Sequence, residues 1–116
     1  MEPFVLLRVA EGPAHGYELA QSIAALGFRR AADDPSVVYK VLRGLEDRGY
    51  LISEWGVAGA GPPPRTYRLT AAGRVYLDER AEDLERQAKR IRAFLERYRR
   101  HRASRRAGRS ARRKKA

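Results

Sequence analysis

Apolar positions near the start of the chain predict two helices. A first helix is expected from about Pro3 to Ala10, where apolar residues cluster before Gly12 and Pro13 interrupt them. A second helix is expected from Gly16 to Leu26, where an apolar stripe precedes Gly27. The apolar residues of both segments are expected to contribute to one compact core.

The next apolar stripe predicts a third, shorter helix. Asp34 is a suitable N-cap, and Pro35 suits the first helical position, where its missing N–H costs nothing. Gly49 would end the helix, and the stretch from Phe28 to Asp33 would be the turn before it. Three apolar residues at helical spacing would form its buried face: Val38, Leu42 and Leu45.

The pattern then changes to that of a β-hairpin. Leu51 to Val57 alternates as a strand does, the segment from Gly59 to Pro64 would form the loop, and Thr66 to Leu69 would return. Thr70 would cap a long final helix. This order indicates a winged helix-turn-helix: a mainly α fold with a small β-hairpin, followed by a long C-terminal dimerisation helix. A helix joined to a hairpin is typical of DNA-binding proteins.

The final helix has the most regular periodicity in the chain. Its apolar residues alternate spacings of four and three, as in the a/d seam of a coiled coil. A second helix is needed to cover so narrow a stripe, which favours self-association, although packing on the chain's own domain or docking of another protein would also cover it. The predicted dimerisation residues are Leu77, Ala81, Leu84, Ala88, Ile91, Leu95 and Tyr98.

Charge divides the chain into three parts. The net charge is +11 over 116 residues, yet residues 1–70 hold eight basic and eight acidic side chains. Residues 99–116 hold ten basic side chains and no acidic one. We therefore expect a DNA-binding domain at 1–70, a dimerisation helix at 71–100 and a basic tail at 101–116 that is disordered or frayed when free.

The basic tail suggests contact with nucleic acid. Several adjacent arginines would add an affinity for DNA or RNA that depends on salt and not on sequence. A solvated tail that only keeps the dimer soluble is the alternative. The predicted phosphate contacts are Arg105, Arg106, Arg109, Arg112, Arg113, Lys114 and Lys115.

The sequence gives little sign of other chemistry. There is no cysteine, and no window approaches the roughly 18 apolar residues of a membrane span, so a cytoplasmic protein is expected. His15 and His101 lack acidic or cysteine companions at ligand spacing, so no metal site or cofactor is expected. His15 is instead expected to cap or pack the second helix. No nucleophile has a base partner, which argues against an enzyme.

Two aromatic residues outside the helical stripes have alternative roles. Tyr17 is expected to be a core residue. Trp55, the single tryptophan, is expected to pack against the domain, with contact to an apolar effector as the alternative.

Three segments resemble the PadR family of transcriptional regulators, in its short form with a single C-terminal helix. Residues 12–19 (GPAHGYEL) are similar to the family's opening motif. Val38-Tyr39 together with residues 45–51 (LEDRGYL) resembles its recognition helix, and residues 61–73 (GPPPRTYRLTAAG) resemble its wing. The resemblance covers residues 3 to about 98, so the basic tail lies outside it.

The resemblance implies a homodimeric, mostly repressing DNA binder that responds to small apolar or aromatic effectors and performs no catalysis. It implies that one face of the third helix enters the major groove, with Tyr39 on a phosphate. Arg43 could read guanine or remain an ordinary solvated charge. Arg65 at the wing tip would reach the backbone or minor groove. The implied DNA-binding residues are Ser36, Val37, Tyr39, Lys40, Arg43, Arg65 and Arg68.

Two functions therefore compete. The first is a sequence-specific, effector-modulated homodimeric repressor, bound to the nucleoid through its operator. The second is an architectural or general nucleic-acid-binding protein in which the basic tail dominates affinity. The ratio of specific to non-specific affinity separates the two, because affinity due to the tail falls with salt equally for all sequences.

Overall fold

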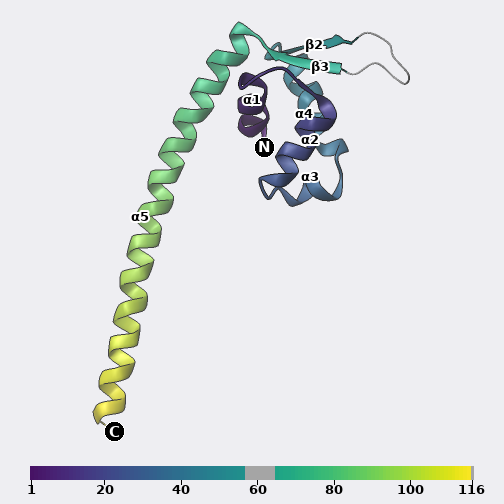
Figure 1. Ribbon diagram of the computed structural model, residues 1–116. Coiled ribbons are helices and arrows are strands. Elements are labelled where there is room, and N and C mark those ends of the chain that lie inside the picture. The colour runs from purple at the N-terminus through teal and green to yellow at the C-terminus, as the bar shows by residue number, and fades with distance from the viewer. Residues whose placement is uncertain (57–64, 116) are drawn as a thin grey trace. The chain divides into compact units, whose positions relative to one another are not determined.

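The computed structural model describes residues 1–56 and 65–115, with side chains through residue 111. They form two compact units, residues 1–81 and 82–116. Figure 1 shows the elements in chain order. They are α1 (Glu2–Ala10), β1 (Ala14–His15), α2 (Gly16–Ala25), α3 (Arg29–Asp33), α4 (Ser36–Asp47), β2 (Leu51–Trp55), β3 (Arg65–Leu69) and α5 (Ala71–Lys115).

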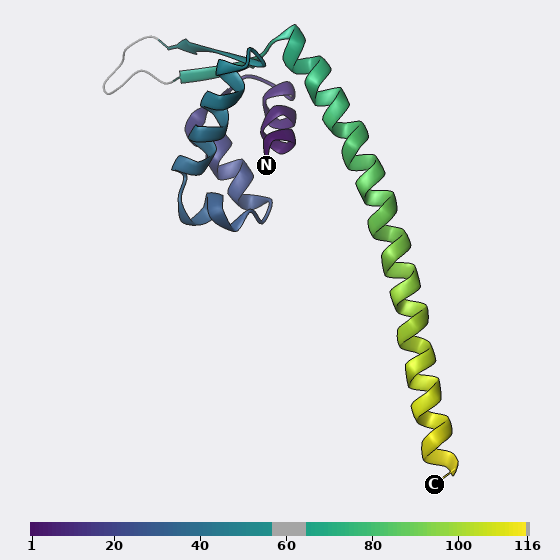
Figure 2. The same ribbon diagram turned by 180° about the vertical axis from the view of Figure 1, so that it is seen from behind.

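The core of the first unit lies between three helices and the sheet. The apolar stripes of α1, α2 and α4 are buried together, as their periodicity predicts. Figures 1 and 2 show the short helices gathered on one side of β2 and β3. The fully buried residues with the largest side chains are Leu6, Leu19, Ile23, Leu42, Leu45, Leu51, Val5 and Val38. Burial of such side chains contributes about 1.5–3 kcal/mol each.

A three-stranded antiparallel sheet closes the unit, in the order β1-β3-β2. β3 is the central strand, and its Tyr67 is opposite Ala14 on one side and Ser53 on the other. The predicted hairpin is confirmed as β2 and β3, while its loop lies outside the described residues. β1 was not predicted, because two residues are too few to show the alternation of a strand.

The turn before α4 differs from its prediction. Part of the stretch from Phe28 to Asp33 is helical, as α3. α4 begins one residue later than predicted, with Pro35 at the N-cap position. Asp34 still satisfies a free backbone donor, because its Oδ1 accepts a hydrogen bond of 3.0 Å from the N–H of Ser36. That bond lowers the pKa of the Asp34 carboxyl group.

Thr70 fixes the start of α5 as predicted. Its Oγ1 accepts a hydrogen bond of 2.9 Å from the N–H of Gly73 and donates one of 2.7 Å to the carbonyl of Gly49. A Cβ atom at Gly73 would lie 2.0 Å from the carbonyl oxygen of Tyr50. The first turn of α5 therefore approaches the α4–β2 connection so closely that only glycine fits.

The end of α5 corrects the predicted boundary at residue 100. The helix continues to Lys115, so the stretch from 101 to 115 is helical instead of disordered or frayed. Arginine and alanine are good helix formers, and the stretch contains no proline, which explains the continuation. The absence of apolar periodicity after Tyr98, on which the prediction rested, does not prevent a helix. No helix of the described residues is long and apolar enough to cross a membrane.

Candidate nucleic-acid interface

One face of α4 is polar and open to solvent. Ser36, Tyr39, Lys40 and Arg43 are exposed, and Val37 is half-buried. The opposite face is fully buried, with 0% exposure for Val38, Leu42 and Leu45. The five residues that the sequence placed in the major groove thus share the outward side of a helix that the core holds firmly. Hydroxyl, amine and guanidinium groups on such a face can donate hydrogen bonds to base edges and phosphates.

Tyr39 is held against the start of α2. A Cβ atom at Gly16 would lie 2.6 Å from Cε1 of Tyr39, so the phenol ring lies directly on the glycine backbone. The side chain is nevertheless 36% exposed. An aromatic ring positioned by packing at its edge leaves its hydroxyl group in a defined place, which suits a phosphate contact.

Arg65 does not extend from the wing as predicted. Its Nε donates to Oγ of Ser53 at 2.8 Å, and its Nη2 donates to both carboxylate oxygens of Glu46 at 3.3 Å. The guanidinium also lies 5.2 Å from the Trp55 ring centroid and 5.8 Å from that of Tyr67. In this structure Arg65 therefore joins the wing to the end of α4. The pairing was missed because Glu46 and Arg65 are far apart in the sequence.

The ring of Tyr67 lies at the centre of this region. Burial raises the pKa of the Tyr67 phenol, while the charges of Arg65 and Arg43 act in the opposite direction. The charges of Arg43 in α4 and Arg65 in β3 thus both act on the buried phenol of Tyr67. Arg68, the other predicted wing residue, is exposed and lies 3.9 Å from a carboxylate oxygen of Glu54 across the hairpin.

Three side chains have environments that differ from their predictions. Tyr17 is 66% exposed and not a core residue, because the buried stripe of α2 runs through other positions. Trp55 is 65% exposed and does not pack into the domain, because β2 becomes more exposed toward its end. His15 occupies the N-cap position of α2 as predicted, but its side chain makes no cap hydrogen bond; its Nδ1 lies 3.1 Å from Oγ1 of Thr66 in β3.

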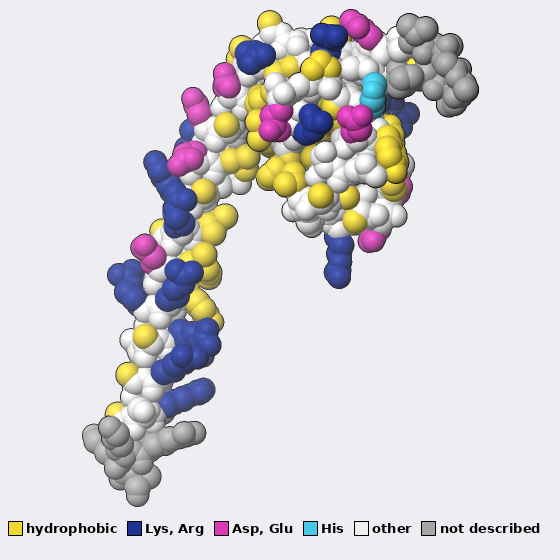
Figure 3. All heavy atoms as spheres, in the orientation of Figure 1, with side chains coloured by type: hydrophobic (Ala, Val, Ile, Leu, Met, Phe, Trp, Pro, Cys, Tyr) yellow, Lys and Arg dark blue, Asp and Glu magenta, His cyan; other side chains and the backbone are white. Residues whose placement is uncertain are grey.

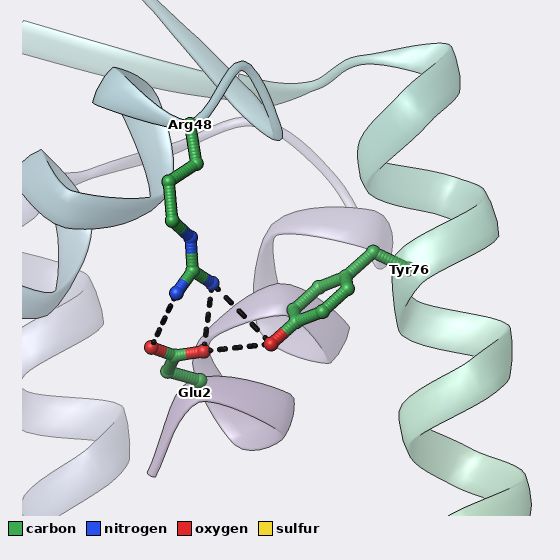
Figure 4. Close-up of polar contacts among 3 residues, drawn as sticks. All are labelled: Glu2, Arg48 and Tyr76. Atoms are coloured by element: carbon green, nitrogen blue, oxygen red, sulfur yellow. Dashed lines mark hydrogen bonds and ion pairs between the residues drawn. The ribbon is translucent and has the colours of Figure 1, made fainter.

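A second polar cluster links α1, α4 and α5 within the first unit (Figure 4). Arg48 donates to Glu2 at 2.9 and 3.4 Å and to the Tyr76 hydroxyl group at 3.3 Å, and that hydroxyl donates to Glu2 at 3.0 Å. The Tyr76 ring stacks on Tyr50 with centroids 4.2 Å apart. Burial would raise the pKa of Glu2, but the hydrogen bonds from Arg48 and Tyr76 lower it below its ordinary value.

The predicted dimerisation stripe is largely uncovered on α5. Leu77 packs against the core of the first unit. In the second unit Leu84 is 38%, Ile91 57% and Tyr98 46% exposed. Figure 3 shows apolar side chains in yellow along the middle of the helix and dark blue basic ones toward its end. Of the predicted tail contacts, Arg105, Arg106 and Arg109 are exposed. The side chains of Arg112, Arg113, Lys114 and Lys115 lie outside the described ones.

No group of three or more histidine, aspartate or glutamate residues that could hold a metal ion occurs in the described part of the chain.

The order α1-β1-α2-α3-α4-β2-β3, with an exposed polar face on α4, defines a winged helix-turn-helix DNA-binding domain. The chain belongs to the transcriptional regulator PadR-like family, whose model matches residues 5–79. It is thus a transcriptional regulator, a class that is generally not enzymatic.

Individual relatives agree with this assignment. The chain is 36% identical over 87 residues to the transcriptional regulator Rv3488 of Mycobacterium tuberculosis, covering 75% of this chain and 78% of the relative. The solved structure of TM0937, described as a potential transcriptional factor, has a TM-score of 0.71 at 38% identity, with coverage of 85% and 87%. The putative transcriptional regulator TA0346 from Thermoplasma acidophilum has a TM-score of 0.69 at 29% identity, with coverage of 81% and 88%.

Proposed function

We propose that this regulator is a homodimeric repressor that reads its operator through α4. The observation that carries the proposal is the two-sidedness of α4. Its apolar residues are completely buried, while Tyr39, Lys40 and Arg43 face outward together. A rigidly held helix with donors on its free side fits the major groove, and an arginine there can bind guanine through two hydrogen bonds.

Dimerisation through α5 supports sequence recognition. The stripe from Leu84 to Tyr98 is exposed in the single chain, although its spacing is that of a coiled-coil seam. Large apolar side chains at regular spacing gain stability when a second helix covers them. A two-fold dimer would present two α4 helices to two half-sites about one helical turn of DNA apart.

The proposal includes a small apolar or aromatic effector that modulates operator binding. It also includes a cytoplasmic location of the protein. Trp55 offers a ring that is 65% exposed, with the Arg65 guanidinium on it. An aromatic ligand could stack on this ring, next to the contacts that join the wing to α4. Binding would then shift the population between wing positions that fit DNA and those that do not.

The test is binding of labelled DNA from the gene's own upstream region, with a scrambled sequence as competitor. We expect a preference of about 10³-fold or more for the native region. Arg43→Gln is expected to lower that preference about 10-fold. Arg74→Gln, which removes an exposed arginine at the start of α5, is the matched control. Equal affinity of the unchanged protein for native and scrambled DNA would reject the proposal.

A general nucleic-acid-binding protein is the second candidate. The ten basic side chains among residues 99–116, without an acidic one, favour it. Its signature is a small preference for the native region and a strong, sequence-independent loss of affinity with salt. A chain that ends at Arg100 separates the two candidates. Specific binding by this shorter chain supports the repressor, whereas complete loss of binding supports the second candidate.

A further inference from the structure

One continuous face of α5 changes from apolar to basic at its C-terminal end. Leu84, Ala88, Ile91, Leu95 and Tyr98 follow alternating spacings of four and three residues along the helix. The same spacing continues without a break, but every further position of the described side chains is arginine: Arg102, Arg105 and Arg109. This continuation became visible only because α5 does not end at residue 100.

Within residues 102–111 all the basic side chains lie on that face. At 3.6 residues per turn, Arg106 falls beside Arg102, Arg105 and Arg109, and all four are exposed. We call these four residues the arginine ridge. The opposite face of the same turns carries small side chains, which are Ala103, Ser104, Ala107, Gly108, Ser110 and Ala111. Repulsion among basic residues would be least if they were spread around the helix, so their segregation indicates a surface that meets a negatively charged partner.

No aspartate or glutamate of α5 lies within ion-pair spacing of the ridge. The last acidic residue is Glu96, six positions before Arg102, whereas helical ion pairs form between residues three or four apart. No aspartate or glutamate follows it in the sequence. The four guanidinium groups are therefore available to an outside partner.

A second copy of the chain paired in parallel does not suit the ridge. Two α5 helices paired in parallel along their apolar stripe would place arginine opposite arginine, and like charges repel at such positions. The apolar part of the face can take a second copy, but the basic part needs a polyanion. Because guanidinium groups bind phosphate oxygens bidentately, a phosphate backbone fits them better than isolated carboxylates.

We propose that the arginine ridge binds the phosphate backbone of duplex DNA. This contact is independent of sequence and additional to the one that α4 makes. The choice of DNA rests on the proposed function. Once the winged domain is bound to its operator, neighbouring phosphates are present at high effective concentration for any helix of the same molecule. The ridge adds affinity to every sequence and leaves the choice of operator to α4.

The test compares two variants with the same charge. In the ridge variant, Arg102, Arg105, Arg106 and Arg109 are each changed to glutamine. In the control variant, four basic residues on the other side of α5 are changed to glutamine: Lys89, Arg90, Arg97 and Arg100. Glutamine has nearly the helix propensity of arginine, and both variants lose four charges. Circular dichroism and sedimentation verify helix content and oligomeric state.

Affinity for duplex DNA is measured against salt concentration for the full-length proteins. Each phosphate contact contributes about 0.9 to the slope of log K against log salt, so we expect the ridge variant to lose about 3 units and the control less than 1. Equal slopes in the two variants would overturn the proposal, since charge alone would then matter. It would also be overturned if the ridge variant binds DNA like the unchanged protein and loses binding only to a single-stranded RNA.

The outcome is independent of the test for the proposed function. That test depends on the ratio of native to scrambled DNA, which the ridge variant is expected to keep within about two-fold. A missing preference would reject the specific repressor and leave the slope comparison valid. A ridge variant with a normal slope would reject the ridge and leave the repressor valid.

Discussion

Arg65, the first residue of β3, donates two hydrogen bonds of 3.3 Å to Glu46, near the end of α4. The pair connects the base of the wing to the helix that is proposed to read DNA. Both side chains are partly shielded, with 35% and 25% exposure. A guanidinium committed to this geometry positions the hairpin relative to α4 and is not free to contact phosphate at the same time.

Arg65→Lys tests whether this residue positions the wing. Lysine keeps the charge but cannot reproduce the donors of Nε and Nη2 to Ser53 and Glu46. We expect Arg65→Lys to lose about 1–2 kcal/mol of unfolding free energy, nearly as much as Arg65→Gln, as measured by urea denaturation. DNA affinity should fall equally in both variants.

Arg68→Lys on the same strand is the control for this comparison, because Arg68 is exposed and its carboxylate contact is long, at 3.9 Å. Its stability should remain within about 0.5 kcal/mol of the unchanged protein. Near-normal DNA affinity in Arg65→Lys and loss in Arg65→Gln would show instead that the residue is a phosphate contact.

Gly73→Ala should damage the fold. The new Cβ atom would lie 2.0 Å from the carbonyl oxygen of Tyr50 and 2.9 Å from Cδ1 of Leu69. Because the clash involves backbone, α5 must shift, and we expect a loss of at least about 2 kcal/mol in thermal or urea unfolding. Gly44→Ala is the control, since Gly44 is also helical but has open space; it should gain up to about 1 kcal/mol. A stabilised Gly73→Ala variant would contradict the close approach.

The sequence predicted the elements whose pattern is local. Apolar periodicity was enough for the helices α1, α2 and α4, and turn residues were enough for the hairpin. The exposed residues of α4 followed from the same reasoning, because fixing the buried face also fixes the opposite one. The two-residue strand β1 and the short helix α3 carry too few residues to show any period.

Contacts between distant residues escaped prediction. Arg65 was assigned to a DNA contact at the wing tip through the family resemblance, and nothing local in the sequence indicates its bonds to Glu46. The cluster of Glu2, Arg48 and Tyr76 joins residues up to 74 positions apart. Trp55 was expected to pack against the domain because its ring is large and apolar, but β2 becomes exposed toward its end.

The free energy of unfolding should depend on pH through the carboxyl group of Glu2. Its folded-state pKa lies below the ordinary value of 4.5, so its carboxylate stabilises the folded state above that pH and the effect disappears as the pH falls through the folded pKa. Glu2→Gln should therefore be less stable than the unchanged protein at pH 7 and equally stable in acid. The difference should stay below about 1 kcal/mol, because the pair with Arg48 is exposed to solvent.

Urea unfolding at several pH values checks this dependence. Glu11→Gln, which removes an exposed carboxylate just past the other end of α1, reports the effect of charge loss without the cluster. If the difference between the unchanged protein and Glu2→Gln stays constant from pH 7 to pH 3, the hydrogen bonds of Glu2 do not stabilise the folded state.

Charge placed on the stripe of α5 should dissociate the proposed dimer. Leu84→Glu and Ile91→Glu introduce carboxylates at positions that a second helix would cover, where an unpaired charge is costly. We expect each to weaken dimerisation at least about 100-fold, measured by sedimentation equilibrium, while the winged domain keeps its unfolding transition.

Val75→Glu provides the control for this experiment, because Val75 is 59% exposed and falls on the other side of α5. It should leave dimerisation unchanged. If the protein dimerises through this stripe, Leu84→Glu and Ile91→Glu must lose operator binding together with dimerisation. A monomer presents only one α4 to an operator that has two half-sites. A protein that is monomeric before any substitution, yet binds its operator specifically, would show that α5 serves another partner.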